Sequence, residues 1–253
     1  AHGGLAVEDN EDPVAALADV PGHRKWIGKQ RYHVKLGNSY YILPGQWNPR
    51  PDRDGKNQGW VDYHPEHWMD ENGGWALSPR RAEELRCSGC HQVGPGPTVN
   101  EGGEYVLAEA DDPSFWNIGC ESCHGPGSAH RAAAGQGAII NPGNLSVAQQ
   151  NELCGSCHVR VKGHSIGDND PDYPYLGRTY QPGDVLADFI AKDAGGRWPG
   201  GTSKKHHQQY FDYEKSKHFD KLSCISCHTA HNETDAEHDL VRTARDNGLC
   251  AQS

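Results

Sequence analysis

Hydrophobic and polar positions alternate along residues 26–43, WIGKQRYHVKLGNSYYIL, on both sides of Gly37-Asn38. A period of two is typical of a half-buried β-strand, and a Gly-Asn pair between two such runs is typical of a hairpin turn. The pattern therefore predicts a small β-hairpin within an N-terminal, β-rich cap segment over residues 1–75. The Pro-, Gly- and Asn-rich stretch at 48–60 predicts a loop.

Three later segments carry helix signals. Ser78-Pro79 begins a predicted helix through 80–90, because proline is favoured at the first helical position. Ser146 and Gln149 have the spacing of a capping box. Residues 205–221, KHHQQYFDYEKSKHFDK, predict a third helix. We therefore expect a second domain over 76–253, built of short helices and long irregular loops.

The composition does not provide an ordinary hydrophobic core. The apolar residue types make up only 35% of the 253 residues, and no run is long enough to span a membrane. A net charge of −10 argues against nucleic acid as a partner, since phosphates require a basic surface. The chain begins with Ala1-His2, which we interpret as a mature, exported product, either extracellular or periplasmic.

Eight of the nine cysteines form four copies of a Cys-x-x-Cys-His motif. The four copies are Cys87-Ser-Gly-Cys90-His91, Cys120-Glu-Ser-Cys123-His124, Cys154-Gly-Ser-Cys157-His158 and Cys224-Ile-Ser-Cys227-His228. Two thiols three residues apart on one turn can each bond to a porphyrin vinyl group, and the adjacent imidazole can then ligate the iron. The motifs therefore predict four c-type haems, whose flat apolar rings would also complete the core.

Three other interpretations explain less. Disulfides give no reason for a histidine after each pair, although histidine occupies only 16 of 253 positions. Zinc sites also use Cys-x-x-Cys but do not require histidine at this fixed offset. A thiol-exchange site needs one motif near a βαβ pattern, and this chain has four motifs without that pattern.

The ninth cysteine resembles the start of a fifth motif. Cys250 is followed by Ala-Gln-Ser253, so serine stands where the second cysteine would be. A fifth haem site at Cys250 stays open, beside the interpretation as a lone thiol.

Each iron also needs a sixth ligand or an open position. Met69 is the only methionine, whereas twelve histidines remain outside the motifs, so bis-histidine ligation is expected. His228 and His231 are three residues apart and lie on one side of a local turn, so they cannot ligate opposite sides of one iron. His231 is therefore expected to ligate a neighbouring haem. The Gly-Pro-Gly turn after His124 is expected to present His130 to another iron.

Other histidines are further candidates for distal ligands. His207 and His218 are eleven residues apart, which on one helix places them on the same face about 16 Å apart, able to ligate two haems. The choice between His206 and His207 is open. His64 and His67 lie among aromatic residues that could pack on porphyrin edges. His164 is a candidate ligand for a neighbouring haem. Three more histidines are interpreted as structural or as ligands to another subunit: His2, His23 and His33.

The stretches CESCHGPGSAH, PGDVL, HHQQYFDYEKSKH, SCISCHTAH and the terminal LC resemble the multihaem c-type cytochromes related to the tetrahaem cytochrome of ammonia oxidisers. The segment YHVKLGNSYYILPGQW is similar to the upstream region of such proteins. The resemblance implies a multihaem cytochrome c fold, in which short helices and loops surround a haem chain. It favours as distal ligands His130, His207, His218 and His231.

Some tetrahaem members of this family polymerise into extracellular filaments in which a histidine of one subunit ligates a haem of the next. The resemblance thus implies electron transfer to redox proteins or extracellular acceptors, with a homopolymer as the stronger form. The alternatives are a soluble periplasmic carrier and a multihaem reductase of nitrogen or sulfur oxyanions. We favour electron transfer over catalysis, because a reductase needs an open iron and the lysine-ligated Cys-x-x-Cys-Lys motif of related reductases is absent from the sequence.

Overall fold

The chain divides into two compact units, Ala1–Asn117 and Ile118–Ser253. The first Cys-x-x-Cys-His motif therefore lies in the N-terminal unit, whereas the sequence analysis grouped it with the other three. The computed structural model describes residues 29–37, 39–49, 51, 55–74, 82–83, 87–94, 96–102, 105–106, 112, 115–163, 179–192, 196–204, 208–231, 239–242 and 247–251. Five candidate histidines lie outside these ranges: His2, His23, His164, His206 and His207.

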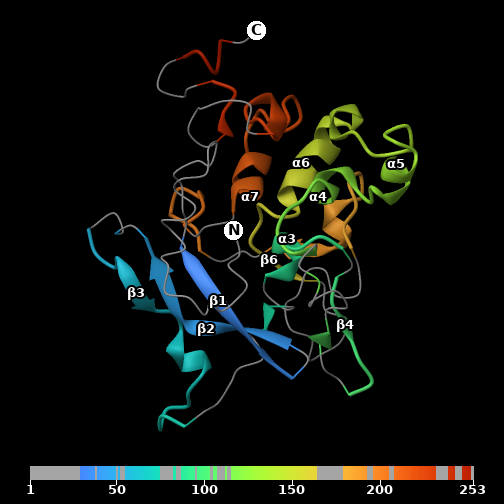
Figure 1. The fold of residues 1–253 in the computed structure, drawn as a ribbon. Helices are drawn as coiled ribbons and strands as arrows, with labels where there is room; N and C mark the ends of the chain where they lie inside the picture. The colour runs from blue at the N-terminus through green and yellow to red at the C-terminus, as the bar shows by residue number, and fades with distance from the viewer. Residues whose placement is uncertain are drawn as a thin grey trace. The chain divides into compact units, whose positions relative to one another are not determined.

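The N-terminal unit contains a three-stranded antiparallel sheet in the order β1-β2-β3 (Figure 1). Its strands are β1 (Gln30–Leu36), β2 (Ser39–Asn48) and β3 (Gly59–Asp62). Leu36 pairs with Ser39, so a two-residue loop joins β1 and β2, and Gly37 at φ +63° supplies the left-handed conformation that such a loop needs. The predicted hairpin is confirmed.

Strand β3 corrects the sequence-based prediction, since it begins inside the stretch expected to be a loop. Trp60 on β3 pairs with Trp47 on β2, and their ring centroids are 5.6 Å apart. Cross-strand aromatic pairs stabilise a sheet. This contact joins residues 13 positions apart and overrides the local loop signal.

A short 3-10 turn, η1 (Pro65–His67), follows the sheet. It is fixed by Trp68, which is 5% exposed and donates its indole N–H to the Ile42 carbonyl on β2 at 2.9 Å. The turn is therefore anchored to the sheet by a buried side chain.

The other described residues of this unit form short elements. Helix α3 (Ser88–His91) carries the first motif, and the two-residue strands β4 (Thr98–Val99) and β5 (Tyr105–Val106) form a small antiparallel pair. A helix was expected over residues 80–90. In the described residues, α3 occupies the last part of this range and extends one residue beyond it, to His91.

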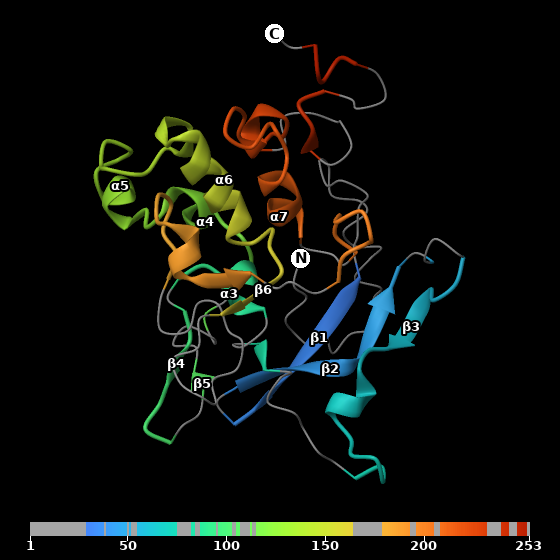
Figure 2. The same cartoon turned by 180° about the vertical axis from the view of Figure 1, so that it is seen from behind.

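The described residues of the C-terminal unit form short helices, turns and one two-stranded antiparallel pair, β6-β7. Its elements are α4 (Glu121–His124), α5 (Ser128–Ala132), η4 (Pro142–Asn144), α6 (Val147–Gly155), β6 (Val161–Gly163), η5 (Leu186–Asp188), β7 (Ile190–Lys192), α7 (Gln209–Glu214) and η6 (Cys224–Ser226). The capping box predicted at Ser146 and Gln149 is present at the start of α6, and this helix contacts α7, η5 and η6 (Figure 2).

Helices α6 and α7 approach closely at Gly155. A Cβ atom there would lie 2.7 Å from Cγ and 2.8 Å from Cε2 of Tyr210, so no larger residue fits without movement. Burial raises the pKa of Tyr210 to about 12. Because Gly155 is the residue after Cys154, this contact places the third motif directly against α7.

Helix α7 is shorter than the helix expected over 205–221, because it ends at Glu214. The chain then turns: Ser216 N–H donates to the Tyr213 carbonyl at 2.8 Å, and the Ser216 hydroxyl accepts from His218 N–H at 3.2 Å. Local serine bonds of this kind compete with helical ones. His218 therefore lies beyond the end of α7. The prediction that one continuous helix carries His207 and His218 on the same face is wrong.

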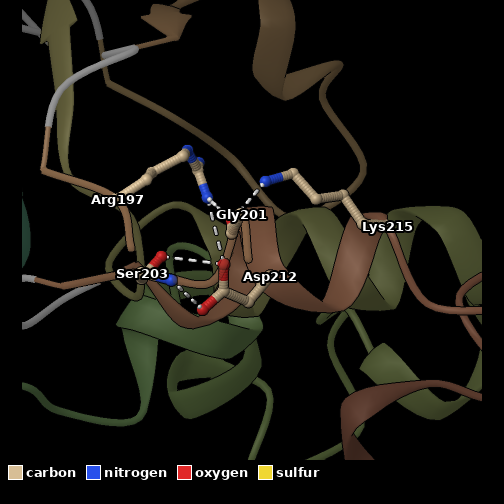
Figure 3. A network of polar contacts seen from close by, with 5 residues as sticks. All are labelled: Arg197, Gly201, Ser203, Asp212 and Lys215. Atoms are coloured by element: carbon tan, nitrogen blue, oxygen red, sulfur yellow. Dashed lines mark hydrogen bonds and ion pairs between the residues drawn. The ribbon is translucent and has the colours of Figure 1, made fainter. Parts of the chain in front are cut away.

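A polar network fixes the loop before α7 to the helix (Figure 3). Asp212 on α7 accepts hydrogen bonds from Arg197 Nη1 at 3.1 Å and from the Ser203 hydroxyl and N–H at 2.8 and 3.0 Å. Arg197 and Lys215 each also donate to the Gly201 carbonyl at 3.1 Å. Within the described residues, no helix combines the length and apolar character needed to traverse a bilayer.

Candidate haem-binding site

All four Cys-x-x-Cys-His motifs adopt the same backbone turn. In each copy the histidine N–H donates to the carbonyl of the first cysteine at 2.9 Å, and the second cysteine N–H approaches the same carbonyl at 3.1 to 3.3 Å. Residues three and four apart on a helical turn share a face. The turn thus places two thiols and one imidazole together, which is the donor set that a covalently attached haem requires.

The cysteines do not gather into another kind of site. All nine lie in the described part of the chain, and none is joined in a disulfide. Within the described ranges, the group in which three His, Cys, Asp or Glu ligand atoms come within 4.8 Å of one another is His64, Glu66 and His67, outside the motifs. The motif residues therefore lack the tetrahedral clustering of a zinc site.

The second motif has a histidine oriented for metal binding. His124 Nδ1 lies 2.8 Å from the Ile140 carbonyl oxygen, and Ile140 N–H returns a bond of 3.2 Å to the His124 carbonyl. A carbonyl only accepts, so Nδ1 carries the proton and Nε2 is the nitrogen that could ligate a metal. Metal-binding histidines usually have such a partner, which fixes the ring and raises its basicity.

The ring of His231 faces this histidine. The centroids of the His124 and His231 rings are 6.2 Å apart and their planes differ by 11°. Two imidazoles on opposite sides of one metal ion have centroids about 6 Å apart, because each metal–nitrogen bond is about 2 Å and each ring centre lies about 1 Å behind its nitrogen. The pair therefore has the spacing of a bis-histidine site.

His130 has a similar orientation on α5. Its Nδ1 lies 2.9 Å from the Gly137 carbonyl oxygen, which again leaves Nε2 as the nitrogen that could ligate a metal. Gly137 has no room for a side chain, because a Cβ atom would come within 2.8 Å of the His130 Cα. The loop therefore passes closely over α5 and holds this imidazole in one orientation.

The third and fourth motifs are joined by Asn151, whose side chain is fully buried on α6. Its Nδ2 donates to the Phe219 and Leu222 carbonyls at 3.0 and 3.2 Å, and its Oδ1 accepts from Cys224 N–H at 2.9 Å. One amide thus fixes the start of the fourth motif to the helix that carries the third. Sequence reasoning missed Asn151, although a polar residue three positions before Cys154 was visible.

Side chains of these two motifs also interact directly. A hydrogen bond between Cys154 and Cys224 raises the pKa of the Cys154 thiol and lowers that of Cys224. Burial, and then the charge of nearby His228, lowers the pKa of His158. Burial, followed by the neighbouring Cys157, raises the pKa of Cys123. The second, third and fourth motifs therefore lie close together in the C-terminal unit.

The other predicted residues are placed differently. His91 ends α3 in the N-terminal unit, where its carbonyl accepts from Asn117 N–H at 2.8 Å. His218 lies in the turn after α7. His33 on β1 pairs with buried Glu83 at 3.2 Å, which fits its structural interpretation. Cys250 is exposed.

Comparisons with known proteins agree with the motif geometry. The family described as cytochrome c554 and c-prime matches residues 56–125, a range that contains the first two motifs. The outer cell wall cytochrome OcwA has a similar fold, with a TM-score of 0.51 and 22% identity over 85% of this chain and 45% of OcwA. The undecahaem cytochrome from the S-layer of Carboxydothermus ferrireducens aligns at a TM-score of 0.37 and 17% identity, over 86% of this chain and 34% of its own. No curated protein matches.

This chain spans less than half the length of either solved structure. The family match covers two of the four repeated turns, and the similarity to OcwA extends over most of the chain at the level of the fold. Residues 56–125 therefore match the cytochrome c554 and c-prime family, and the chain is similar in fold to an outer cell wall cytochrome.

Proposed function

We propose that this chain transfers electrons through four covalently bound c-type haems with bis-histidine ligation. The observation that carries the proposal is the His124–His231 pair, whose rings are 6.2 Å apart and nearly parallel. Two imidazoles on one iron leave no position for a substrate. When bound, the haems supply a one-electron iron couple, and the protein's part is to hold them in place.

The chain's own residues perform three tasks in this proposal. The paired cysteines of each motif attach a porphyrin, and the following histidine ligates the iron: His91, His124, His158 and His228. His231 provides the sixth ligand opposite His124. The other distal ligands are His130, oriented by the Gly137 carbonyl at 2.9 Å, together with His207 and His218.

Rigidity of these ligands favours electron transfer over catalysis. The Ile140 and Gly137 carbonyls fix the orientation of His124 and His130. Ligands that stay in place in both redox states keep the reorganisation around the metal small. An oxyanion reductase would instead need an iron with an open position, and high-spin haem in the wild-type protein would favour that function.

The test combines pyridine haemochrome quantification with low-temperature EPR of the wild type and His231→Ala. We expect four haems per chain, all low-spin in the wild type, and loss of one low-spin signal in His231→Ala. His64→Ala serves as the matched control, since it removes an exposed imidazole outside the motifs. An unchanged low-spin spectrum in His231→Ala would refute the pairing with His124. A count below four would refute the haem number, and five would assign a haem to Cys250.

We further propose that the protein is exported and forms an extracellular filament with copies of itself. The support is the family resemblance, together with solved structures described as an outer cell wall and an S-layer cytochrome. Early histidines such as His2 and His23 would ligate a haem of the next subunit. Electron microscopy of wild type, His2→Ala and His23→Ala tests this: a soluble monomer in the wild type, or unchanged filaments in both variants, would contradict it.

A further inference from the structure

A second metal-binding geometry lies away from the haem motifs, on the turn that follows β3. The ligand atoms of His64, Glu66 and His67 all lie within 4.8 Å of one another. His64 Nδ1 is 2.8 Å from Glu66 Oε1, and the His64 and His67 ring centroids are 5.5 Å apart. Two imidazoles and a carboxylate thus converge within four residues.

The backbone holds these side chains in place. His64 has φ +55° and ψ +53°, a left-handed conformation that costs a residue with a side chain on the order of 1 kcal/mol. Pro65 then begins the 3-10 turn, and His67 N–H donates to the His64 carbonyl at 3.1 Å. The indole of Trp68 anchors the end of the turn to β2 at 2.9 Å. The triad is therefore built on a rigid support.

The donor set identifies the class of ligand. Imidazole suits first-row transition metals rather than Ca²⁺ or Mg²⁺, and two histidines with one carboxylate are a recurring zinc and iron set. We propose that His64, Glu66 and His67 bind a divalent first-row transition metal ion such as Zn²⁺, separately from the haems.

Small side-chain movements complete this site. In a tetrahedral zinc site, the ligand atoms are about 3.3 Å apart. The ligand atoms of the triad are at most 4.8 Å apart, so the longest of these distances must shorten by about 1.5 Å when the metal binds. His64 and Glu66 are exposed and His67 is half-buried, so their rings and carboxylate can rotate without disturbing the core. Three protein ligands leave the fourth position to water. The site thus has the composition of an open three-ligand centre.

The experiment titrates ZnCl₂ into the haem-loaded, chelator-treated full chain by isothermal calorimetry. We expect one Zn²⁺ site in the wild type that is weakened at least tenfold in Glu66→Gln and His67→Ala. Glu71→Gln is the matched control, because it removes an exposed carboxylate of the same segment outside the triad and should bind like the wild type.

Two outcomes would overturn the proposal. One is Zn²⁺ binding that is absent from the wild type or equal in wild type, Glu66→Gln and His67→Ala. The other is a low-spin to high-spin change in the EPR spectrum of His64→Ala or His67→Ala, which would make that histidine a haem ligand. Neither readout depends on the pairing of His124 with His231, so this proposal and the proposed function fail separately.

Discussion

Replacement of Asn151 by alanine should loosen the attachment of the fourth motif to α6. The substitution removes three hydrogen bonds with the backbone of Phe219, Leu222 and Cys224, at 3.0, 3.2 and 2.9 Å, from a site with no solvent exposure. A fourth bond, from Cys224 Sγ at 3.3 Å, is left out of the sum because a thiol bonded to haem cannot donate it. Each such bond contributes a net of about 1 kcal/mol, so local opening should become easier by about 3 kcal/mol. That difference corresponds to about 100-fold faster exchange.

The assay is amide hydrogen exchange of the segment containing Cys224, measured by mass spectrometry on haem-loaded protein. Asn151→Asp should also speed exchange, because a carboxylate cannot donate to the Phe219 and Leu222 carbonyls, although it keeps an acceptor for the Cys224 N–H. Gln150→Ala is the control on the same helix, since it mainly loses one bond of 2.8 Å to the Leu145 carbonyl. Equal protection of Cys224 in wild type, Asn151→Ala and Asn151→Asp would refute the role assigned to this amide.

Three other perturbations have defined outcomes. Gly155→Ala should destabilise the α6–α7 contact by about 1–3 kcal/mol, because its Cβ would overlap the Tyr210 ring. Thermal melting should show a lower midpoint for Gly155→Ala than for Ala148→Gly, the reverse substitution at an exposed position of the same helix. Burial alone would raise the pKa of Asp212, but the hydrogen bonds from Ser203 and the ion pair with Arg197 outweigh burial and lower this pKa. The carboxylate therefore stabilises the loop above the unfolded-state pKa, near 3.8, and this stabilisation is lost as the pH falls through the folded-state pKa. Hydrogen exchange of residues 196–204 should therefore quicken at acid pH in the wild type, beyond the chemical rate, and show no such step in Asp212→Asn. Trp68→Phe removes the indole bond to β2 and should cost about 1 kcal/mol in denaturant unfolding of the N-terminal unit, whereas an unchanged midpoint would show that this bond does not anchor the turn.

Features set by neighbouring residues could be predicted from the sequence. The hairpin at Gly37 and the capping box at Ser146 each depend on groups a few positions apart. The Cys-x-x-Cys-His spacing likewise defined a turn that recurs with the same hydrogen bonds in all four copies. The type of each of these elements could therefore be predicted, because each depends on residues close together in the sequence.

Features set by contacts between distant segments could not be predicted in this way. Strand β3 depends on Trp60 meeting Trp47, and the end of α7 depends on the turn at Ser216. His231 was predicted as a distal ligand from its spacing to His228. The partner proposed for it, His124, is 107 positions away in the numbering and is proposed only from the ring geometry. Sequence spacing limited the possible pairings, and tertiary contacts selected among them.

The bonds of Asn151 also have a consequence for the order in which the chain folds. Its partners lie 68 to 73 positions later in the sequence. Long-range contacts form late, since the entropy of closing the intervening loop must first be overcome. We therefore expect α6 to stay partly open until residues 219–224 are made, which leaves the thiols of Cys154 and Cys224 accessible for the proposed attachment of haem during that interval.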